Sequence, residues 1–205
     1  GSRSALCELK DFSNETVTAT IVNWIKEPSE LPVDVTIAQA LPKADKLETV
    51  VQKGTELGAV AFLPFRAQRS VVKWTAEKTK KKIARLKKIA KEAAEQAHRE
   101  RVPRIADLAA FDGLIQHGSN YDVKIVAFEE EANNTKALPS TLTSVRSGQS
   151  ILFVTGPEGG LTEHEVAKLK QCGFVVCGLG PRILRTETAP LYFLAAVSYQ
   201  TELLR

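Results

Sequence analysis

The segments ILFVTGPEGGLT (151–162) and FVVCGLGPRILRTETAP (174–190) decide the fold of this chain, because each runs from a short apolar stretch through a Gly- and Pro-rich loop into a predicted helix. The apolar stretches predict strands at 151–155 and 174–178. In an open α/β sheet, loops at the carboxyl ends of neighbouring strands border the crevice where a ligand binds. Glycines in such loops let backbone amides approach that ligand closely. We therefore expect the functional site between these two loops.

From residue 33 onward the chain alternates predicted strands with predicted helices. Such alternation is typical of the α/β class, in which helices cover both faces of a mostly parallel sheet. Thr162 and Glu165 form a Ser/Thr-x-x-Glu capping box at the start of one helix. The other strands are predicted at 33–41, 59–65 and 123–128, and the helices at 44–57, 75–99, 162–171 and 188–204.

Before residue 33 the sequence predicts a hairpin and a linker. Strands at 5–10 and 16–24 are joined by a turn at 11–14, and the linker runs from Pro28 to Pro32. A two-stranded hairpin is only marginally stable by itself in water. We therefore divide the chain into a small N-terminal part, residues 1–32, and a main α/β domain, residues 33–205.

The composition is that of a globular protein, with 205 residues of which 43% are hydrophobic and 25% charged. No apolar run approaches the roughly 20 residues of a membrane span, and the N-terminus lacks the pattern of an export signal. We therefore expect a cytoplasmic protein with no membrane partner. The three cysteines and three histidines fit no metal-ligand spacing, so we expect no metal site.

Positive charge is concentrated in one segment. The net charge is only +4, yet residues 66–104 hold 14 Lys and Arg against 4 Asp and Glu, which leaves −6 for the remainder. An excess of this kind predicts binding to a polyanion, and a phosphate backbone is the obvious candidate. A solvated helix face is the alternative, because it explains most charge runs.

The loop at 156–160 is neither a P-loop nor a dinucleotide fingerprint, because it lacks the Gly-Lys-Ser/Thr ending and the Gly-x-Gly-x-x-Gly spacing. A tight strand-to-helix turn is the simplest structural explanation. The Glu158 carboxylate would repel a phosphate, but it suits a ligand that carries a cation or hydroxyl groups. S-adenosyl-L-methionine has both, in its sulfonium and its ribose.

Six motifs in order resemble the RsmE family, the uracil-N(3)-methyltransferases of small-subunit (16S) ribosomal RNA in the SPOUT superfamily. Besides the two loops, these are LPKADKLE (41–48), QKGTELG (52–58), RSV (69–71) and EAAEQ (92–96). The resemblance covers nearly all of the chain from about residue 33. It implies a C-terminal trefoil knot in the α/β fold. It also implies a preceding PUA-like β-barrel, of which residues 1–32 resemble the second half.

The resemblance further implies a homodimer whose interface is formed by the last helix and the knot. One side of that helix is expected to face the core, with Leu191, Leu194, Ala195, Val197 and Ser198. The other side is then available to a second subunit, with Tyr192, Phe193, Ala196 and Tyr199, although a fully buried helix also fits these residues.

The resemblance implies that three segments enclose S-adenosyl-L-methionine. They are the first loop, the second loop at 179–184, whose backbone would bond the adenine edge, and residues 127–130. The implied cofactor-binding residues are Ala127, Phe128, Glu129, Thr155, Gly156, Pro157, Glu158, Gly159, Gly160, Leu179, Gly180, Arg182, Ile183, Leu184, Thr188 and Ala189.

Arg185 and Glu187 are the candidate catalytic residues. Methyl transfer to a uracil ring nitrogen requires removal of its proton, because the neutral imide is a poor nucleophile. We expect Arg185 to stabilise the developing uracil anion, with Glu187 as base or orienter. The structural alternative is that Glu187 favours the following helix N-terminus and pairs with an arginine.

Candidate RNA contacts flank the first and second helices of the main domain. The resemblance places the end of the basic helix on the RNA side, although a surface pair of Glu95 with Arg99 is the simpler interpretation. The candidates are Lys43, Lys46, Arg66, Arg69, Lys73, Gln96 and Arg99.

The sequence therefore predicts methylation of ring nitrogen 3 of a uridine in 16S ribosomal RNA, with S-adenosyl-L-methionine as donor. The partner would be 16S rRNA or the small ribosomal subunit. A ribose 2′-O-methyltransferase of the same superfamily is the nearest alternative. A non-catalytic RNA-binding ribosome assembly factor is an alternative of a different class.

Overall fold

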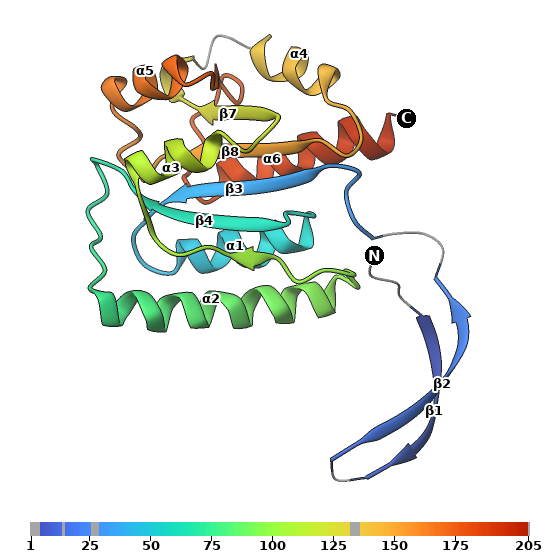
Figure 1. Ribbon diagram of the computed structural model, residues 1–205. Coiled ribbons are helices and arrows are strands. Elements are labelled where there is room, and N and C mark those ends of the chain that lie inside the picture. The colour runs from blue at the N-terminus through green and yellow to red at the C-terminus, as the bar shows by residue number, and fades with distance from the viewer. Residues whose placement is uncertain (1–4, 14, 26–28, 132–135, 205) are drawn as a thin grey trace.

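The structure, a computed structural model, describes residues 5–13, 15–25, 29–131 and 136–204. Two sheets are present in these ranges: an isolated hairpin and a seven-stranded sheet covered by helices (Figure 1). Asn14 of the predicted turn and Pro28 of the predicted linker lie outside the described residues. None of the described helices is long and apolar enough to cross a membrane.

The large sheet is parallel throughout, with strand order β5-β4-β3-β8-β7-β9 and the short β6 also paired to β4. The α/β prediction is confirmed, and the five strands predicted in the main domain are all found. They are β3 (Asp34–Ala40), β4 (Ala61–Arg66), β7 (Val123–Ala127), β8 (Ser150–Thr155) and β9 (Val175–Cys177). The two-residue strands β5 (Arg104–Ile105) and β6 (Ala109–Ala110) are too short to leave a pattern in the sequence.

Helices cover both faces of this sheet, as Figure 1 shows. Those predicted from the sequence are α1 (Lys46–Glu56), α2 (Ala76–Gln96), α5 (Glu163–Gln171) and α6 (Thr188–Ser198), the last continuing as a π-helical turn, Tyr199–Leu203. The capping box of Thr162 with Glu165 is present. Three elements were not predicted: α3 (Phe111–Gly118), α4 (Ala137–Ser144) and a 3₁₀ turn, Glu129–Glu131.

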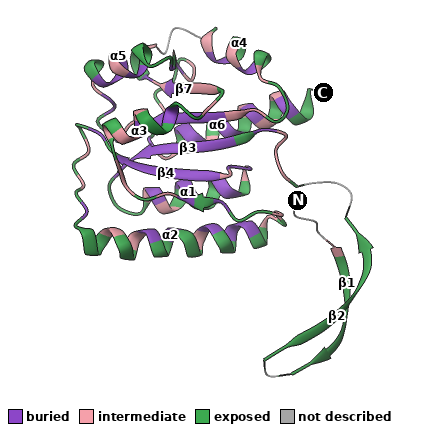
Figure 2. Cartoon of the chain, in the orientation of Figure 1, coloured by how far each residue is buried: buried purple, intermediate pink, exposed green. Residues whose placement is uncertain are grey.

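Alternate strand residues point to opposite faces and build two apolar clusters. On one face, Ile37 and Phe153 pack with α1, α2 and α6. On the other, Ala38 and Val154 pack with α3 and α5. The strands are therefore buried on both sides (Figure 2), and their carboxyl ends hold the following loops on a rigid support.

The predicted orientation of α6 is wrong at two positions. Phe193, expected on the side available to a second subunit, is fully buried and stacks on Phe153 with 3.8 Å between ring centroids. Ala195, expected to face the core, is exposed. Because the helix is apolar nearly all round, its periodicity did not define which stripe faces the core. Tyr192 and Tyr199 are exposed as expected.

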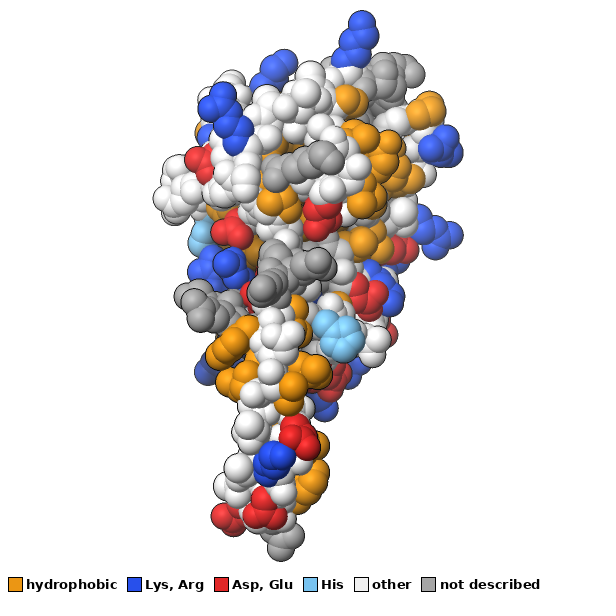
Figure 3. All heavy atoms as spheres, turned by 90° about the vertical axis from the view of Figure 1, so that its right-hand side faces the viewer, with side chains coloured by type: hydrophobic (Ala, Val, Ile, Leu, Met, Phe, Trp, Pro, Cys, Tyr) orange, Lys and Arg blue, Asp and Glu red, His pale blue; other side chains and the backbone are white. Residues whose placement is uncertain are grey.

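The N-terminal hairpin consists of β1 (Ala5–Phe12) and β2 (Val17–Trp24), paired antiparallel as predicted. β1 runs two residues farther than expected, through Asp11 and Phe12. The hairpin projects from the rest of the molecule in Figure 1, and apolar side chains are visible over it in Figure 3. Almost all of its residues are exposed, so it contributes nothing to either cluster.

Candidate active site

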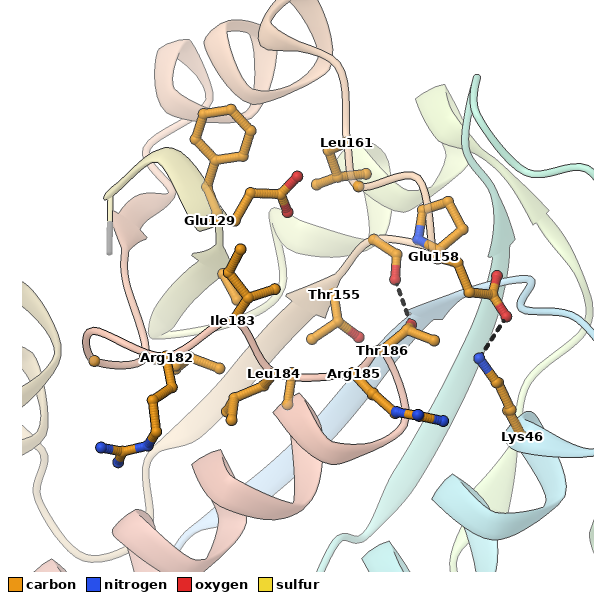
Figure 4. Close-up of a pocket in the computed structure, with 18 residues that line it drawn as sticks. Lys46, Glu129, Thr155, Glu158, Leu161, Arg182, Ile183, Leu184, Arg185 and Thr186 are labelled. Atoms are coloured by element: carbon orange, nitrogen blue, oxygen red, sulfur yellow. Dashed lines mark hydrogen bonds and ion pairs between the residues drawn. The ribbon is translucent and has the colours of Figure 1, made fainter. Parts of the chain in front are cut away.

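A pocket of about 370 Å³ lies at the carboxyl ends of β7, β8 and β9, between the two Gly- and Pro-rich loops (Figure 4). This volume falls in the usual range for small-molecule sites. All predicted cofactor residues line the pocket except Gly159 and Thr188. The lining residues are Lys46, Ala127, Phe128, Glu129, Thr155, Gly156, Pro157, Glu158, Gly160, Leu161, Leu179, Gly180, Arg182, Ile183, Leu184, Arg185, Thr186 and Ala189.

The two exceptions are explained by where their backbone lies. The Gly159 carbonyl accepts a hydrogen bond from Arg69 at 3.0 Å, which turns it toward the β4–α2 connection. Thr188 is exposed in the first turn of α6. Leu161 and Thr186 were missed, although both belong to the quoted loops. Lys46, predicted as an RNA contact, also lines the pocket.

The β8–α5 loop, residues 156–162, requires glycine for steric reasons. A Cβ on Gly156 would lie 2.8 Å from the Leu161 backbone nitrogen and 2.9 Å from the Gly160 carbonyl carbon. Gly160 has a φ of +69°, and a Cβ there would lie 2.6 Å from a carboxylate oxygen of Glu129. Because these two glycines have no Cβ, the loop backbone and the Glu129 carboxylate can lie close together at the pocket wall.

Gln39, at the end of β3, ties the two loops together from below the pocket. Its side chain is almost fully buried and accepts a hydrogen bond from Thr155 Oγ1 at 2.7 Å. Its amide nitrogen lies 2.9 Å from Thr186 Oγ1 and 3.2 Å from the Gly156 carbonyl. Thr186 Oγ1 in turn donates to the Gly156 carbonyl at 2.7 Å. This network links β3, β8 and the β9–α6 loop, residues 178–187, and no short sequence motif revealed it.

A cation between two carboxylates lies at one side of the pocket. Lys46 Nζ is 2.9 Å from Glu158 Oε1 and 3.4 Å from Glu187 Oε2. The hydrogen bond with Glu158 raises the pKa of the Lys46 ammonium. Burial acts to raise the pKa of the Glu158 carboxyl, but bonds from Lys46 Nζ and from backbone amides, including that of Lys43 at 2.9 Å, outweigh it and lower that pKa. Both groups are therefore charged near neutral pH.

Glu187 does not line the pocket, but it pairs with Lys46, which does. Its Oε2 is shielded from solvent and has no hydrogen-bond partner among the described residues. Apart from the Lys46 ammonium at 3.4 Å, no described group lies close enough to donate to this oxygen, so it is able to accept a hydrogen bond from a bound molecule. The pairing of Glu187 with an arginine, considered above as the structural alternative, is not found within the described ranges, where its ion-pair partner is Lys46.

The β9–α6 loop is more open than the β8–α5 loop. Ile183 is 85% exposed, and Gly180 has a φ of +100° with open space around it. Within the part of the chain described, the Arg182 and Arg185 side chains have no ion-pair or hydrogen-bond partner. Figure 4 shows the Arg185 side chain directed toward the side of the pocket that holds Lys46, and the Arg182 side chain directed away from it. Arg185 is therefore free to meet a ligand.

Arg99 was predicted as an RNA contact, and the structure contradicts this. Its side chain is 1% exposed, pairs with Glu30, and donates to the carbonyls of Thr55 at 3.0 Å and Ala59 at 2.5 Å. The residue therefore joins the segment before β3 to the end of α1. Nor is the simple surface pair with Glu95 present, because Glu95 lies near Lys91 instead.

The remaining RNA candidates are at the surface. Lys43, Arg66, Arg69, Lys73 and Gln96 are exposed. Arg66 donates to the Trp74 carbonyl at 3.2 Å, and Arg69 is held against the β8–α5 loop. Arg69 therefore joins the basic segment directly to the rim of the pocket.

Among the described residues, no cluster of three or more His, Cys, Asp or Glu could hold a metal ion. Cys177 lies at the end of β9 close to the pocket, but burial, with a smaller effect of Glu131, raises the pKa of its thiol to about 12. It is thus a poor nucleophile. The described site offers carboxylates, cations and backbone amides as its chemical groups.

The pocket fits S-adenosyl-L-methionine in shape and charge. Leu161, Leu179, Ile183 and Leu184 supply apolar surface for a flat ring system, and Glu129 supplies a carboxylate for hydroxyl groups or a cation. Comparison with known proteins supports this assignment of the ligand. The family model of the RNA methyltransferase domain matches residues 29–198. The chain belongs to this family.

Two curated relatives carry a more specific name, ribosomal RNA small subunit methyltransferase E. The relative from Bacillus subtilis is 54% identical over 98% of this chain and 79% of its own length. The relative from Synechocystis is 34% identical over 93% of this chain and 61% of its own length.

The fold of these RNA methyltransferases is also found in a solved structure. The methyltransferase E of Neisseria gonorrhoeae, solved bound to S-adenosyl methionine, superposes with a TM-score of 0.81 at 29% identity, covering 96% of this chain and 78% of that one. The predicted family is thereby confirmed.

Proposed function

We propose that this protein transfers the methyl group of S-adenosyl-L-methionine to ring nitrogen 3 of a uridine in 16S ribosomal RNA. The observation that carries the proposal is the pocket at the ends of β7, β8 and β9, whose two loops hold the residues that resemble the RsmE motifs. Membership of the RNA methyltransferase family and the relatives' names support the same reaction. The cofactor supplies an electrophilic methyl group on its sulfonium.

The residues of the chain divide the binding task between them. The backbone of 156–160 and the Glu129 carboxylate hold the polar parts of the cofactor, while Leu179, Ile183 and Leu184 cover its adenine. The carboxylate of Glu158 fixes Lys46 at the rim through their 2.9 Å contact. Arg185 and Lys46 line this side of the pocket, where the uridine would enter.

Glu187 removes the N3 proton of the uridine, and its solvent-shielded Oε2 supports this role. Lys46 Nζ, 3.4 Å from Glu187 Oε2, holds this carboxylate in place beside the pocket. Arg185 donates to a uracil carbonyl oxygen on which negative charge develops as the proton leaves. The N3 lone pair then forms the new bond to the methyl carbon, and the carbon–sulfur bond breaks with its electrons left on sulfur.

The finer features of the fold belong to the same proposal. The strand order β8-β7-β9, with α6 returning from the sheet edge to contact α1 and β8, supports a C-terminal trefoil knot. The exposed apolar hairpin supports a division at residue 32 and a PUA-like barrel that includes residues 1–32. The exposed Tyr192 and Tyr199 of the α6 region support a homodimer. A ribosomal RNA substrate supports a cytoplasmic location.

The RNA reaches the pocket over the exposed basic residues at its rim. Lys43, Arg66, Arg69 and Lys73 keep this assignment. Gln96, an uncharged residue at the end of α2 and about 30 Å along the helix axis from Ala76, remains a proposed RNA contact away from the rim. Arg69 is best placed, because its guanidinium already touches the β8–α5 loop.

The test is methylation of purified small ribosomal subunits and of free 16S rRNA with labelled S-adenosyl-L-methionine, followed by nucleoside analysis by mass spectrometry. We expect 3-methyluridine as the product. A 2′-O-methylated nucleoside would instead identify the ribose enzyme. Failure of the cofactor to bind in calorimetry would favour an RNA-binding assembly factor.

A further inference from the structure

The basic side chains of α2 differ in whether a carboxylate neutralises them. On the flank facing α1 and on the outward face, most cations are paired within the helix or with Glu48 of α1, and Lys78 is an unpaired exception among the described residues. The paired residues are Lys82 and Arg85 with Glu48, Lys81 with Glu77 and Lys88 with Glu92, at 2.6 to 3.7 Å. Much of the charge of this helix is therefore already balanced by the protein itself.

The opposite flank of α2 carries cations that are not balanced. Within the described ranges, Lys80 and Lys87 have no ion-pair or hydrogen-bond partner for their ammonium groups. Lys91 pairs with Glu95 at 3.7 Å, as Lys88 does with Glu92, so the two described cations of this flank without a partner are Lys80 and Lys87. At 3.6 residues per turn, Lys80, Lys87 and Lys91 lie within about 40° of one another around the helix axis. They form one stripe, beside the buried residue Ile83.

This stripe borders a groove of about 880 Å³ between α2, the β5–β6 segment and α3. Arg104, on the side of the groove formed by β5, has no side-chain partner among the described residues, and His117 of α3 also lines the groove. Asp107 is the one carboxylate among the lining residues. The lining residues are Lys87, Lys91, Val102, Pro103, Arg104, Ile105, Ala106, Asp107, Leu108, Ala109, Gly113 and His117.

We propose that this groove binds the phosphate backbone of ribosomal RNA outside the target nucleotide, an inference that rests on the proposed function. Lys87, Lys91 and Arg104 outnumber Asp107, so the groove attracts an anion. Binding to a phosphate is more favourable in free energy for an unpaired lysine or arginine than for one that must first break its ion pair with a carboxylate. The apolar lining lets the sugar part of the strand lie against the protein.

The groove is placed to continue an RNA path that starts at the pocket. Arg69 touches the β8–α5 loop, and Lys73 precedes the first turn of α2 at Ala76. Lys87 follows about 17 Å farther along the helix axis, at 1.5 Å per residue. A strand that presents its uridine to the pocket is therefore able to reach the groove.

The test compares two double variants with the same loss of charge, one at the groove between α2 and β5 and one on the outward face of α2. Lys87→Gln with Arg104→Gln removes groove cations, and Lys81→Gln with Lys88→Gln removes cations that are already paired. All four side chains are at the surface, and thermal unfolding checks that both variants fold. The probe is an unmethylated 16S rRNA fragment that contains the uridine on which the enzyme acts. The affinity of each variant for this fragment is measured from low to moderate salt.

We expect the groove variant to lower the slope of log affinity against log salt by about 1.4 to 1.8, the contribution of two phosphate contacts. The paired-cation control should change the slope by much less. A scrambled fragment should show the same loss, because backbone contacts carry no sequence information. Equal losses in the two variants, or no loss in the groove variant, would overturn the proposal.

Failure of the groove proposal is distinguishable from failure of the proposed function. If the wild type methylates the fragment while the groove variant keeps wild-type affinity and salt slope, only the groove proposal fails. If the wild type binds the cofactor but methylates no uridine of the small subunit, the proposed function fails first.

Discussion

The two loops that enclose the pocket differ in how the protein holds them. In the β8–α5 loop, Gly156, Glu158 and Gly159 each accept hydrogen bonds from residues outside the loop. In the β9–α6 loop, Ile183 is 85% exposed, and Arg185 has no side-chain partner among the described residues. The first loop is thus held along its length by other segments, whereas the second is held at Thr186 and Glu187 and is open from Gly180 to Arg185. Changes in the first should alter stability or cofactor binding, and changes in the second should alter turnover.

The largest effect is expected from a change in the β9–α6 loop. Arg185→Ala should lower the methylation rate by roughly 10²- to 10³-fold, because a donor aimed at the developing anion is lost. Binding of S-adenosyl-L-methionine, measured by calorimetry, and the melting temperature should stay close to the wild type. Arg146→Ala, an exposed arginine outside both loops, is the control. An unchanged rate in Arg185→Ala would remove this residue from the mechanism.

The next largest effect is expected from a change in the β8–α5 loop. Gly156→Ala introduces a Cβ within 2.8 and 2.9 Å of backbone atoms, so the loop must shift. Displacement of a binding loop by about 1 Å can cost on the order of 100-fold in function, and we expect a cofactor affinity loss of that size in calorimetry. Gly159→Ala, whose Cβ would lie 3.4 Å from Arg69 Cβ, is the milder control from the same loop. Equal affinities in the two variants would show that crowding at Gly156 does not position the loop.

Removal of the link between the loops should act on stability. Gln39→Leu leaves the buried hydroxyl of Thr155 without its acceptor and takes a donor from Thr186. Leaving buried polar groups unsatisfied costs about 1–3 kcal/mol, which denaturant unfolding should detect together with weaker cofactor binding. Gln116→Leu on the exposed face of α3 is the matched control. Wild-type stability and affinity in Gln39→Leu would argue that each loop is positioned independently.

The smallest effect is a pH-dependent change in the melting temperature, caused by Glu158 of the β8–α5 loop. Because its partners lower the pKa of the Glu158 carboxyl, its stabilisation is complete above the ordinary Glu value and is lost as the pH falls through the lowered value. Glu158→Gln should melt about 2–4 °C below the wild type at neutral pH, for a contribution near 1 kcal/mol. The difference should shrink below about pH 4, the region of an unperturbed Glu.

Glu77→Gln provides the comparison for this experiment, since Glu77 and Lys81 form a pair that is mostly exposed. Its melting temperature should stay close to that of the wild type at every pH. A difference between Glu158→Gln and the wild type that grows toward acid would contradict the assigned pKa direction.

Much of the site was predictable because its residues lie in two short segments. Gly156 and Glu158 follow from the strand-to-loop pattern, Ile183 and Arg185 from the family resemblance of the second loop, and the pocket contains all four. Gln39 was missed because a single glutamine in a strand gives no signal, and its partners come from β8 and the β9–α6 loop. The short strands β5 and β6 and the helices α3 and α4 were missed because their segments show little periodicity.

The sequence by itself determined the five main strands, four of the helices, the parallel α/β class and the two loops at the sheet edge, because periodicity and glycine placement are properties of neighbouring residues. Only the tertiary structure decided the partners of charged and aromatic groups. It placed Lys46 between Glu158 and Glu187, buried Arg99 against Glu30 and stacked Phe193 on Phe153. Such pairs form between residues far apart in the chain, and they exist only once the parallel strands have brought their ends together.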